Sequence, residues 1–187
     1  VIQVRLTNGD DEIILASKNG KAIRFNEQTV RVMGRTATGV KGMTLEDELD
    51  GVVGMIAVPK DSTDSVLVIS ELGNGKRSLL EDYRITNRGG KGVKTINITE
   101  KTGKLVAIKS VNDDNDIMII KKSGVTIRIH AKDIKVIGRA TQGVNLITLK
   151  DGDQIASVCK VIAEEEDVID NINESNETGI DTEKTES

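Results

Sequence analysis

Apolar and polar positions alternate in short runs along the chain, which is the period of half-buried β-strands. Examples are residues 30–33, 83–86 and 134–137. Upstream of each lies a continuous apolar run, at residues 12–16, 65–69 and 117–120, rich in Ile, Leu and Val, residue types that favour strands. Glycine-containing turns separate the runs, and the 3.6-residue period of amphipathic helices is missing. The pattern predicts an all-β protein.

The runs recur as a repeat with a period near fifty residues. Arg35, Arg88 and Arg139 lie 53 and 51 residues apart, and each is followed by a glycine four residues later and a valine five residues later. An apolar run precedes each arginine, and we expect these runs to be strands: 30–33, 83–86 and 134–137. Each repeated turn therefore presents one arginine between two strands.

A hairpin lies upstream of each arginine turn. The expected hairpin turns share a glycine preceded by asparagine or serine: Asn19-Gly20, Asn74-Gly75 and Ser123-Gly124. Asn-Gly is a strong hairpin signal because both turn residues tolerate positive φ. Two more strands are expected after each arginine turn, at 40–45 and 52–58, 93–98 and 105–111, and 144–149 and 155–161. Four or five short strands per unit at this period are typical of propeller blades.

The repeat predicts the domain organisation. One domain spans residues 1–163, with blades at about 11–62, 63–114 and 115–163, and residues 1–6 resemble the last strand of a preceding blade. Residues 164–187 carry ten acidic side chains and one lysine, a charge of −9 that leaves +5 on the remainder. So few apolar residues cannot offset the ordering entropy, and we expect a disordered tail. It either solubilises the protein or competes with an anionic ligand for the basic domain.

Composition limits the cellular compartments in which the protein is expected. Cys159 is the only cysteine in the sequence, so no intrachain disulfide can form. No apolar run approaches the ~20 residues that span a bilayer, and the N-terminal residues lack the layout of a signal peptide. A cytoplasmic protein without a membrane partner is expected.

Four motifs carry a family resemblance. GRTATGVKG, GNGKRS, RGGKGV and GRATQGV, in this order and followed by an acidic tail, closely resemble the C-terminal domain of bacterial DNA gyrase A. The resemblance implies a six-bladed β-pinwheel, whose neighbouring blades exchange strands, and covers its last three blades and the end of the third. The family's Q-R-R-G-G-K-G box is missing. Its closest match, residues 86–92, has Thr and Asn in place of Gln and Arg.

The resemblance implies that duplex DNA wraps around a basic rim without sequence preference. DNA carries a negative charge every ~1.7 Å, so cations repeated blade by blade would supply phosphate contacts. The candidate DNA-binding residues are Lys21, Arg24, Arg35, Lys41, Lys76, Arg77, Arg88, Lys91, Lys94, Arg128 and Arg139. Phosphate contact is favoured for the repeated arginines over simple solvation, whereas Gly39, Gly92 and Gly143 are expected only to adopt positive φ in their turns.

The same resemblance implies partners: the rest of gyrase A, together with gyrase B, in an A2B2 complex of the bacterial nucleoid, supporting ATP-dependent negative supercoiling. ATP and Mg would act in other parts of that complex, and no cofactor, metal or catalytic residue is expected here. Tyr83 occupies an apolar slot of the repeat and is expected in the core, and His130 has no neighbour at metal-ligand spacing. Two alternatives remain: the pinwheel domain of topoisomerase IV, and a protein-interaction scaffold, which the low aromatic content disfavours.

Overall fold

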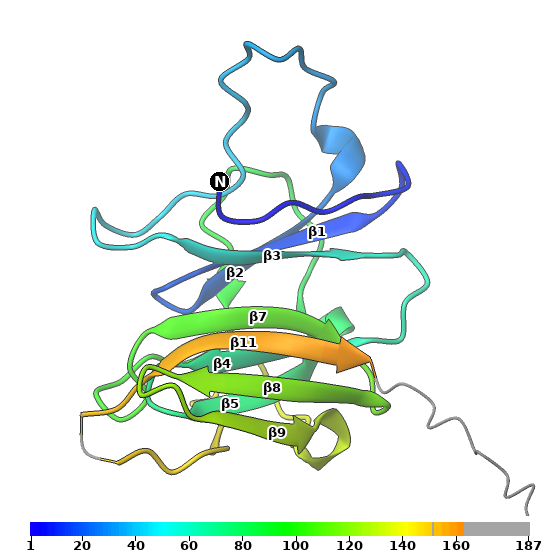
Figure 1. Ribbon diagram of the computed structural model, residues 1–187. Helices are drawn as coiled ribbons and strands as arrows, with labels where there is room; N and C mark the ends of the chain where they lie inside the picture. The colour runs from blue at the N-terminus through cyan, green and yellow to red at the C-terminus, as the bar shows by residue number, and fades with distance from the viewer. Residues whose placement is uncertain (151, 163–187) are drawn as a thin grey trace, which may run out of the picture.

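The chain folds as antiparallel β-sheets joined by turns and three single-turn helices, and the all-β prediction is confirmed. The computed structural model describes residues 1–150 and 152–162 (Figure 1). The strands are β1 (Glu12–Ser17), β2 (Lys21–Asn26), β3 (Val52–Val58), β4 (Ser65–Ser70), β5 (Asn74–Leu79), β6 (Val93–Lys94), β7 (Leu105–Val111), β8 (Asn115–Lys121), β9 (Thr126–His130), β10 (Val144–Asn145) and β11 (Ile155–Ile162). The 3-10 helices are η1 (Glu27–Thr29), η2 (Leu80–Asp82) and η3 (Ala131–Asp133).

Neighbouring units exchange strands, as the pinwheel prediction requires. The strand orders are β3-β1-β2-β6, β10-β5-β4-β7 and β11-β8-β9. In sequence, β6 belongs to the second unit and β10 to the third, yet each closes the sheet of the preceding unit. Among the described residues the third sheet has no fourth strand, so β9 is an edge.

The sheets pack through their innermost strands. β7 contacts both β3 and β11, so the strands at the opposite ends of these sheets form the outer edge. One buried cluster joins the first two units and includes Ile14, Val68 and Tyr83. The Tyr83 hydroxyl lies 2.5 Å from Thr95 Oγ1, and burial raises the pKa of this phenol. The prediction of a core role for Tyr83 is confirmed.

The strands expected beside the arginine turns are mostly absent from the described residues. Residues 30–33 and 40–45 form no strand, and the segments before Arg88 and Arg139 form only isolated parallel bridges, Arg24 with Ile85 and Arg77 with Val136. Their backbone groups bond to the neighbouring unit instead: Thr86 N–H, for example, donates to the Arg24 carbonyl at 2.8 Å. The strands expected at 93–98 and 144–149 shorten to two residues each.

Two further expectations need correction. Residues 1–6 form no strand; they run beside β3, where Gln3 Oε1 accepts a hydrogen bond from Met55 N–H at 2.9 Å. The second hairpin turns at Gly73, with φ +90°, whereas Asn74 and Gly75 lie inside β5. Gly73 follows Gly20 by 53 residues, which is the spacing of the arginines.

The unit boundaries predicted near residues 62 and 114 fall in the loops before β4 and β8, and they stay predictions. Residues 163–187, which include the expected acidic tail, lie outside the described residues.

Candidate nucleic-acid interface

Arg24 and Arg77 occupy equivalent positions of successive units, and both reach forward into the next unit. Arg24 Nη1 donates to the carbonyls of Leu80 at 2.6 Å and Tyr83 at 3.1 Å. Arg77 Nε donates to the carbonyl of Ile134 at 3.0 Å. The two side chains are only 10% and 7% exposed. We call them the forward arginines; because they are buried in the joints between units, their prediction as phosphate contacts is wrong.

Carboxylates complete the surroundings of the forward arginines. Arg24 Nε donates to Glu12 Oε2 at 2.6 Å, and the Glu12 side chain is 6% exposed. Arg77 Nη1 donates to Asp113 Oδ1 at 2.5 Å, on the surface side. A buried charge is tolerable only when it is paired in this way. Both ion pairs lie within one unit, and the contacts that cross the joints are the hydrogen bonds to the carbonyls.

Lys76 is also inside the protein, with no exposed surface. Its ammonium donates to the carbonyl of Gly138 at 2.6 Å, at the start of the third arginine turn. Burial lowers the pKa of Lys76 to about 8 from 10.5. A buried ammonium cannot reach a phosphate, so this predicted contact is wrong as well.

The lowered pKa of Lys76 predicts a pH-dependent stability. The unfolded chain keeps the proton up to about pH 10.5, whereas the folded chain releases it near pH 8, so the free energy of unfolding rises with pH between these values and falls as pH drops back to 8. Lys76→Met should lack this rise. Urea unfolding should show the variant gaining about 2 kcal/mol less than the wild type between about pH 7.5 and 9.5. Identical pH slopes in the two proteins would contradict the assignment.

Arg88 reaches backward into the preceding unit. Its Nε donates to the carbonyl of Thr29 at 3.0 Å, and its Nη1 donates to the carbonyl of Lys41 at 3.2 Å. Two of the three guanidinium nitrogens therefore hold the first unit, and the arginine has a structural role that its sequence context alone did not indicate.

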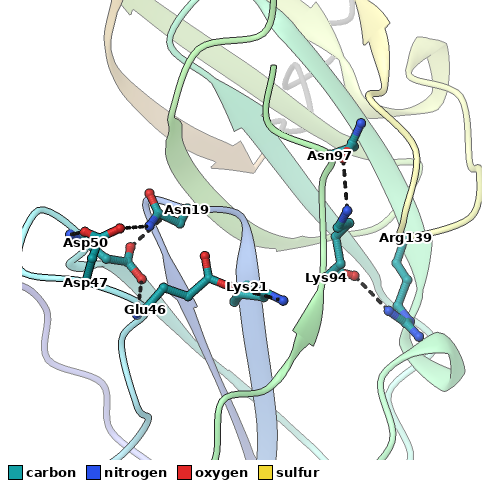
Figure 2. Close-up of polar contacts among 8 residues, drawn as sticks. All are labelled: Asn19, Lys21, Glu46, Asp47, Asp50, Lys94, Asn97 and Arg139. Atoms are coloured by element: carbon teal, nitrogen blue, oxygen red, sulfur yellow. Dashed lines mark hydrogen bonds and ion pairs between the residues drawn. The ribbon is translucent and has the colours of Figure 1, made fainter. Parts of the chain in front are cut away.

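Arg139 repeats the contact one unit later. Its Nε donates to the carbonyl of Asp82 at 3.0 Å, and its Nη1 to the carbonyl of Lys94 at 2.9 Å; Figure 2 shows the guanidinium directed at that carbonyl. We call Arg88 and Arg139 the backward arginines. Both remain partly exposed, but their main partners are protein carbonyls.

Lys21 and Lys94 face each other across the pairing of β2 with β6. Lys21 Nζ lies 3.3 Å from Glu46 Oε1, and Lys94 Nζ donates to Asn97 Oδ1 at 3.0 Å (Figure 2). Surface contacts of this kind are worth at most about 1 kcal/mol and exchange readily for an anionic ligand. Both lysines therefore stay candidates for DNA contact.

Arg128 differs from the forward arginines although it occupies the equivalent position. Its side chain is 59% exposed, and its Nε donates to Asp116 Oδ2 at 2.6 Å. This hydrogen bond, with a second one from His130, holds the pKa of the Asp116 carboxyl below its usual value. His130 is thus occupied by a carboxylate neighbour, and Arg128 remains accessible.

The remaining predicted cations are exposed. Arg35, Lys41 and Lys91 lie in the loops of the first two arginine turns, and their side chains make no hydrogen bond or ion pair with the described residues. Arg35 is at the position of the backward arginines but contacts no preceding unit in the described part of the chain. These three cations are free to meet an anion.

Sequence interpretation missed a further set of exposed cations with the same spacing. Arg31, Arg84 and Lys135 lie 53 and 51 residues apart and are exposed in all three units. These cations lie in the runs 30–33, 83–86 and 134–137, where the alternation of apolar and polar positions predicts strands and gives no sign of a binding role. Arg84 lines a groove with Asn87 and Lys91, along the turn that resembles the box. We call Arg31, Arg84 and Lys135 the rim cations.

Two of the rim cations, Arg84 and Lys135, lie at the outer edge of the sheets. Arg84 immediately precedes Ile85, which forms a β-bridge with Arg24 on β2. The end strand of that sheet, β6, comes shortly after Arg84 in the sequence. Lys135 repeats this geometry beside the bridge of Val136 with Arg77 on β5, whereas Arg31 shares the spacing but has no such bridge among the described residues. A series of cations with this spacing suits an extended anionic polymer better than a small ligand.

No group of three or more His, Cys, Asp or Glu side chains in residues 1–150 and 152–162 could hold a metal ion. In the same part of the chain, no helix is long and apolar enough to cross a membrane.

Known proteins resemble the chain in sequence and in structure. The model of the DNA gyrase C-terminal domain, beta-propeller, matches residues 11–59, 64–112 and 115–159. DNA gyrase A of Staphylococcus aureus is 47% identical over 178 residues, which are 95% of this chain and 20% of that protein. The chain thus spans about one fifth of the length of this relative.

Two solved structures share the fold. The C-terminal domain of DNA topoisomerase IV has a TM-score of 0.80 at 27% identity, covering 87% of this chain and 50% of that one. A DNA gyrase A C-terminal domain has a TM-score of 0.76 at 31% identity, covering 83% of this chain and 52% of that one. With the family model matching most of the chain and the exchanged strands of the fold, the chain belongs to the DNA gyrase C-terminal domain family.

Proposed function

We propose that the chain binds duplex DNA through its phosphates, without sequence preference, along the outer edge of its sheets. The observation that carries this proposal is the series of rim cations, one per unit and exposed at equivalent positions. Phosphate contacts position a protein on DNA but carry no sequence information. Base reading therefore plays no part in the proposal.

The exposed turn cations extend the series. Lys91 lies beside Arg84 in the groove along the second arginine turn, and Lys41 lies in the equivalent loop of the first turn. These two units thus offer several cations each within reach of one stretch of backbone. A curved path of this kind can offset the ~1–6 kcal/mol needed to bend ~20–30 base pairs smoothly.

As part of a longer protein, the chain would supply the DNA-wrapping surface of DNA gyrase A. The 47% identity to the Staphylococcus aureus protein over nearly the whole chain supports this over topoisomerase IV, although the C-terminal domain of that enzyme is structurally similar. Gyrase B, ATP and Mg would act elsewhere in an A2B2 complex that supercoils DNA negatively in the bacterial nucleoid. In this proposal the chain contributes binding and curvature but no catalytic group.

The proposed role of the rim cations predicts the salt dependence of DNA affinity. The triple variant Arg31→Ala, Arg84→Ala, Lys135→Ala should bind a short duplex at least about tenfold more weakly in fluorescence anisotropy, because it loses phosphate contacts. The negative slope of log affinity against log salt should also become less steep, by about 0.9 for each lost contact. Duplexes of unrelated sequence should give the same affinity for the unchanged chain.

A matched control removes the same charge elsewhere. Lys18, Lys104 and Lys122 are exposed and line a hollow where the three units meet, away from the outer edge. Changing all three to alanine should leave the salt slope close to that of the unchanged chain. If both triple variants lost affinity equally, only net charge would matter and the proposed surface would be wrong.

A further inference from the structure

The second strand of the middle hairpin, β5, carries two polar side chains where the other units are apolar. Lys76 and Ser78 lie inside the protein with no exposed surface. Both face a joint whose two units, the second and the third, are described on either side. Their counterparts, counted from the glycine of each hairpin turn, are Ile23 and Phe25 in the first unit and Ile127 and Ile129 in the third.

Lys76 and Ser78 hold the segment that begins the third arginine turn. The Lys76 ammonium donates to the carbonyl of Gly138 at 2.6 Å, and the Ser78 hydroxyl donates to the carbonyl of Ile137 at 2.9 Å. The apolar counterparts in the first unit have no group that could donate to the second turn in this way. The third arginine turn is therefore held by a polar attachment that the second turn lacks.

The segment held in this way carries a cation on either side of the attachment. Lys135, a rim cation, is exposed three residues before Gly138, and Arg139 follows Gly138 directly and is partly exposed. The backbone N–H of Arg77 donates to the carbonyl of Lys135 at 3.0 Å, so this end of the segment is fixed as well. Lys76 lies directly beneath the part of the third unit that we assign to DNA.

The charge of Lys76 is costly at this place. Its ammonium makes no ion pair with a carboxylate of the described residues. Burial lowers its pKa to about 8, Asp82 acts against this shift, and Arg139 adds to it. Tyr83, the other buried titratable side chain here, keeps its proton because burial raises its pKa. A buried charge without a counter-ion costs free energy that an isoleucine would avoid, so the stability of the fold gives no reason for it.

We propose that Lys76 positions the third arginine turn for DNA, and that the affinity for DNA depends on the proton that its amine carries. This inference rests on the proposed function. The ammonium bonds to the Gly138 carbonyl more strongly than a neutral amine would, and it adds one positive charge beneath the bound phosphates. Because coupling between two binding events is reciprocal, bound DNA favours the protonated amine, and binding above about pH 8 takes up a proton.

Fluorescence anisotropy with a short duplex, at constant salt and increasing pH, tests the dependence on the proton. The affinity of the unchanged full chain should fall at least about threefold between about pH 7 and 9.5, because a charge near the phosphates is lost. Lys76→Met should bind more weakly at the lower pH and lack this part of the fall. All other titratable groups are the same in the two chains, so the difference between them isolates Lys76.

Lys109→Met is the matched control for the loss of a lysine. Lys109 is partly buried on the inner strand β7, and burial lowers its pKa too. It lies away from the outer edge of the sheets and holds no arginine turn. This variant should therefore keep the pH profile of the unchanged chain.

Hydrogen exchange of the free chain tests the positioning without DNA. At about pH 7 the Ile137 amide, which donates to the Arg77 carbonyl, should exchange at least about tenfold faster in Lys76→Met, because the segment is held less firmly. The Thr86 amide, its counterpart in the first joint, should not change. Absence of DNA binding by the unchanged chain would contradict the proposed function, and the inference would fall with it. Equal pH profiles of two chains that both bind DNA, or equal exchange at Ile137, would overturn the inference alone.

Discussion

Replacing Gly92 with alanine should lower the free energy of unfolding by about 4 kcal/mol, because a strained backbone costs about 1–3 kcal/mol and overpacking adds a similar amount. The residue has φ +71°, and a Cβ would lie 2.3 Å from the carbonyl oxygen of Ala22 and 2.7 Å from its carbon. Both neighbouring atoms belong to the backbone of β2, so neither can move aside without opening the joint between the first two units.

A second glycine separates the free-energy cost of backbone strain from that of a steric clash. Gly124 has φ +85° in the third hairpin turn, with no atom within 4 Å of the position of a Cβ. Gly124→Ala should therefore lose only the strain, about 1–2 kcal/mol, in the same urea unfolding experiment. Equal losses in the two variants would show that the strand exchange does not depend on the close approach at Gly92.

Replacing Arg24 with alanine should cost about 3–5 kcal/mol, because removing one partner leaves a buried charge without compensation. The Glu12 carboxylate, whose side chain is 6% exposed in the unchanged chain, would lose its paired charge, and the carbonyls of Leu80 and Tyr83 would lose their shared donor. Urea unfolding at neutral pH measures the loss. Adding Glu12→Gln to the variant should restore part of the stability, since contacting residues are energetically coupled.

Arg128→Ala is the matched control at the equivalent position. Asp116 is as buried as Glu12, but Arg128 is 59% exposed and His130 still bonds to the same carboxylate. The loss should stay near the ~1 kcal/mol of exposed ion pairs. A loss as large as that of Arg24→Ala would contradict the assignment of Arg24 as a joint between units.

Much of the fold follows from the sequence because its hairpins are local. The apolar runs of β1, β4 and β8 pair with strands a few residues away, so their richness in Ile, Leu and Val locates them. The two-residue strands β6 and β10 pair with another unit, far upstream in sequence, and leave no pattern of their own. The misplaced second turn shows a related effect: Asn74-Gly75 is the stronger local signal, but the repeat spacing points to Gly73.

The candidate site was harder to predict than the fold. Sequence places Arg24, Arg77 and Arg128 in one class, yet the following unit buries the first two and leaves the third exposed. Burial by a neighbouring unit depends on which partner lies there, which a residue's own context does not show. The rim cation Arg84 does carry a sequence signal, because Arg31, Arg84 and Lys135 share the spacing of the arginine turns.

The role of the rim is tested most directly by mapping lysine reactivity with and without DNA. Mild acetylation of the full chain, followed by mass spectrometry, reports every exposed lysine in one experiment. Lys41, Lys91 and Lys135 should lose reactivity when duplex DNA is bound, and regain it as salt is raised. The lysines of the central hollow, Lys18, Lys104 and Lys122, should react equally in both states. Protection of this second set, with the first set unchanged, would contradict binding of DNA along the outer edge of the sheets.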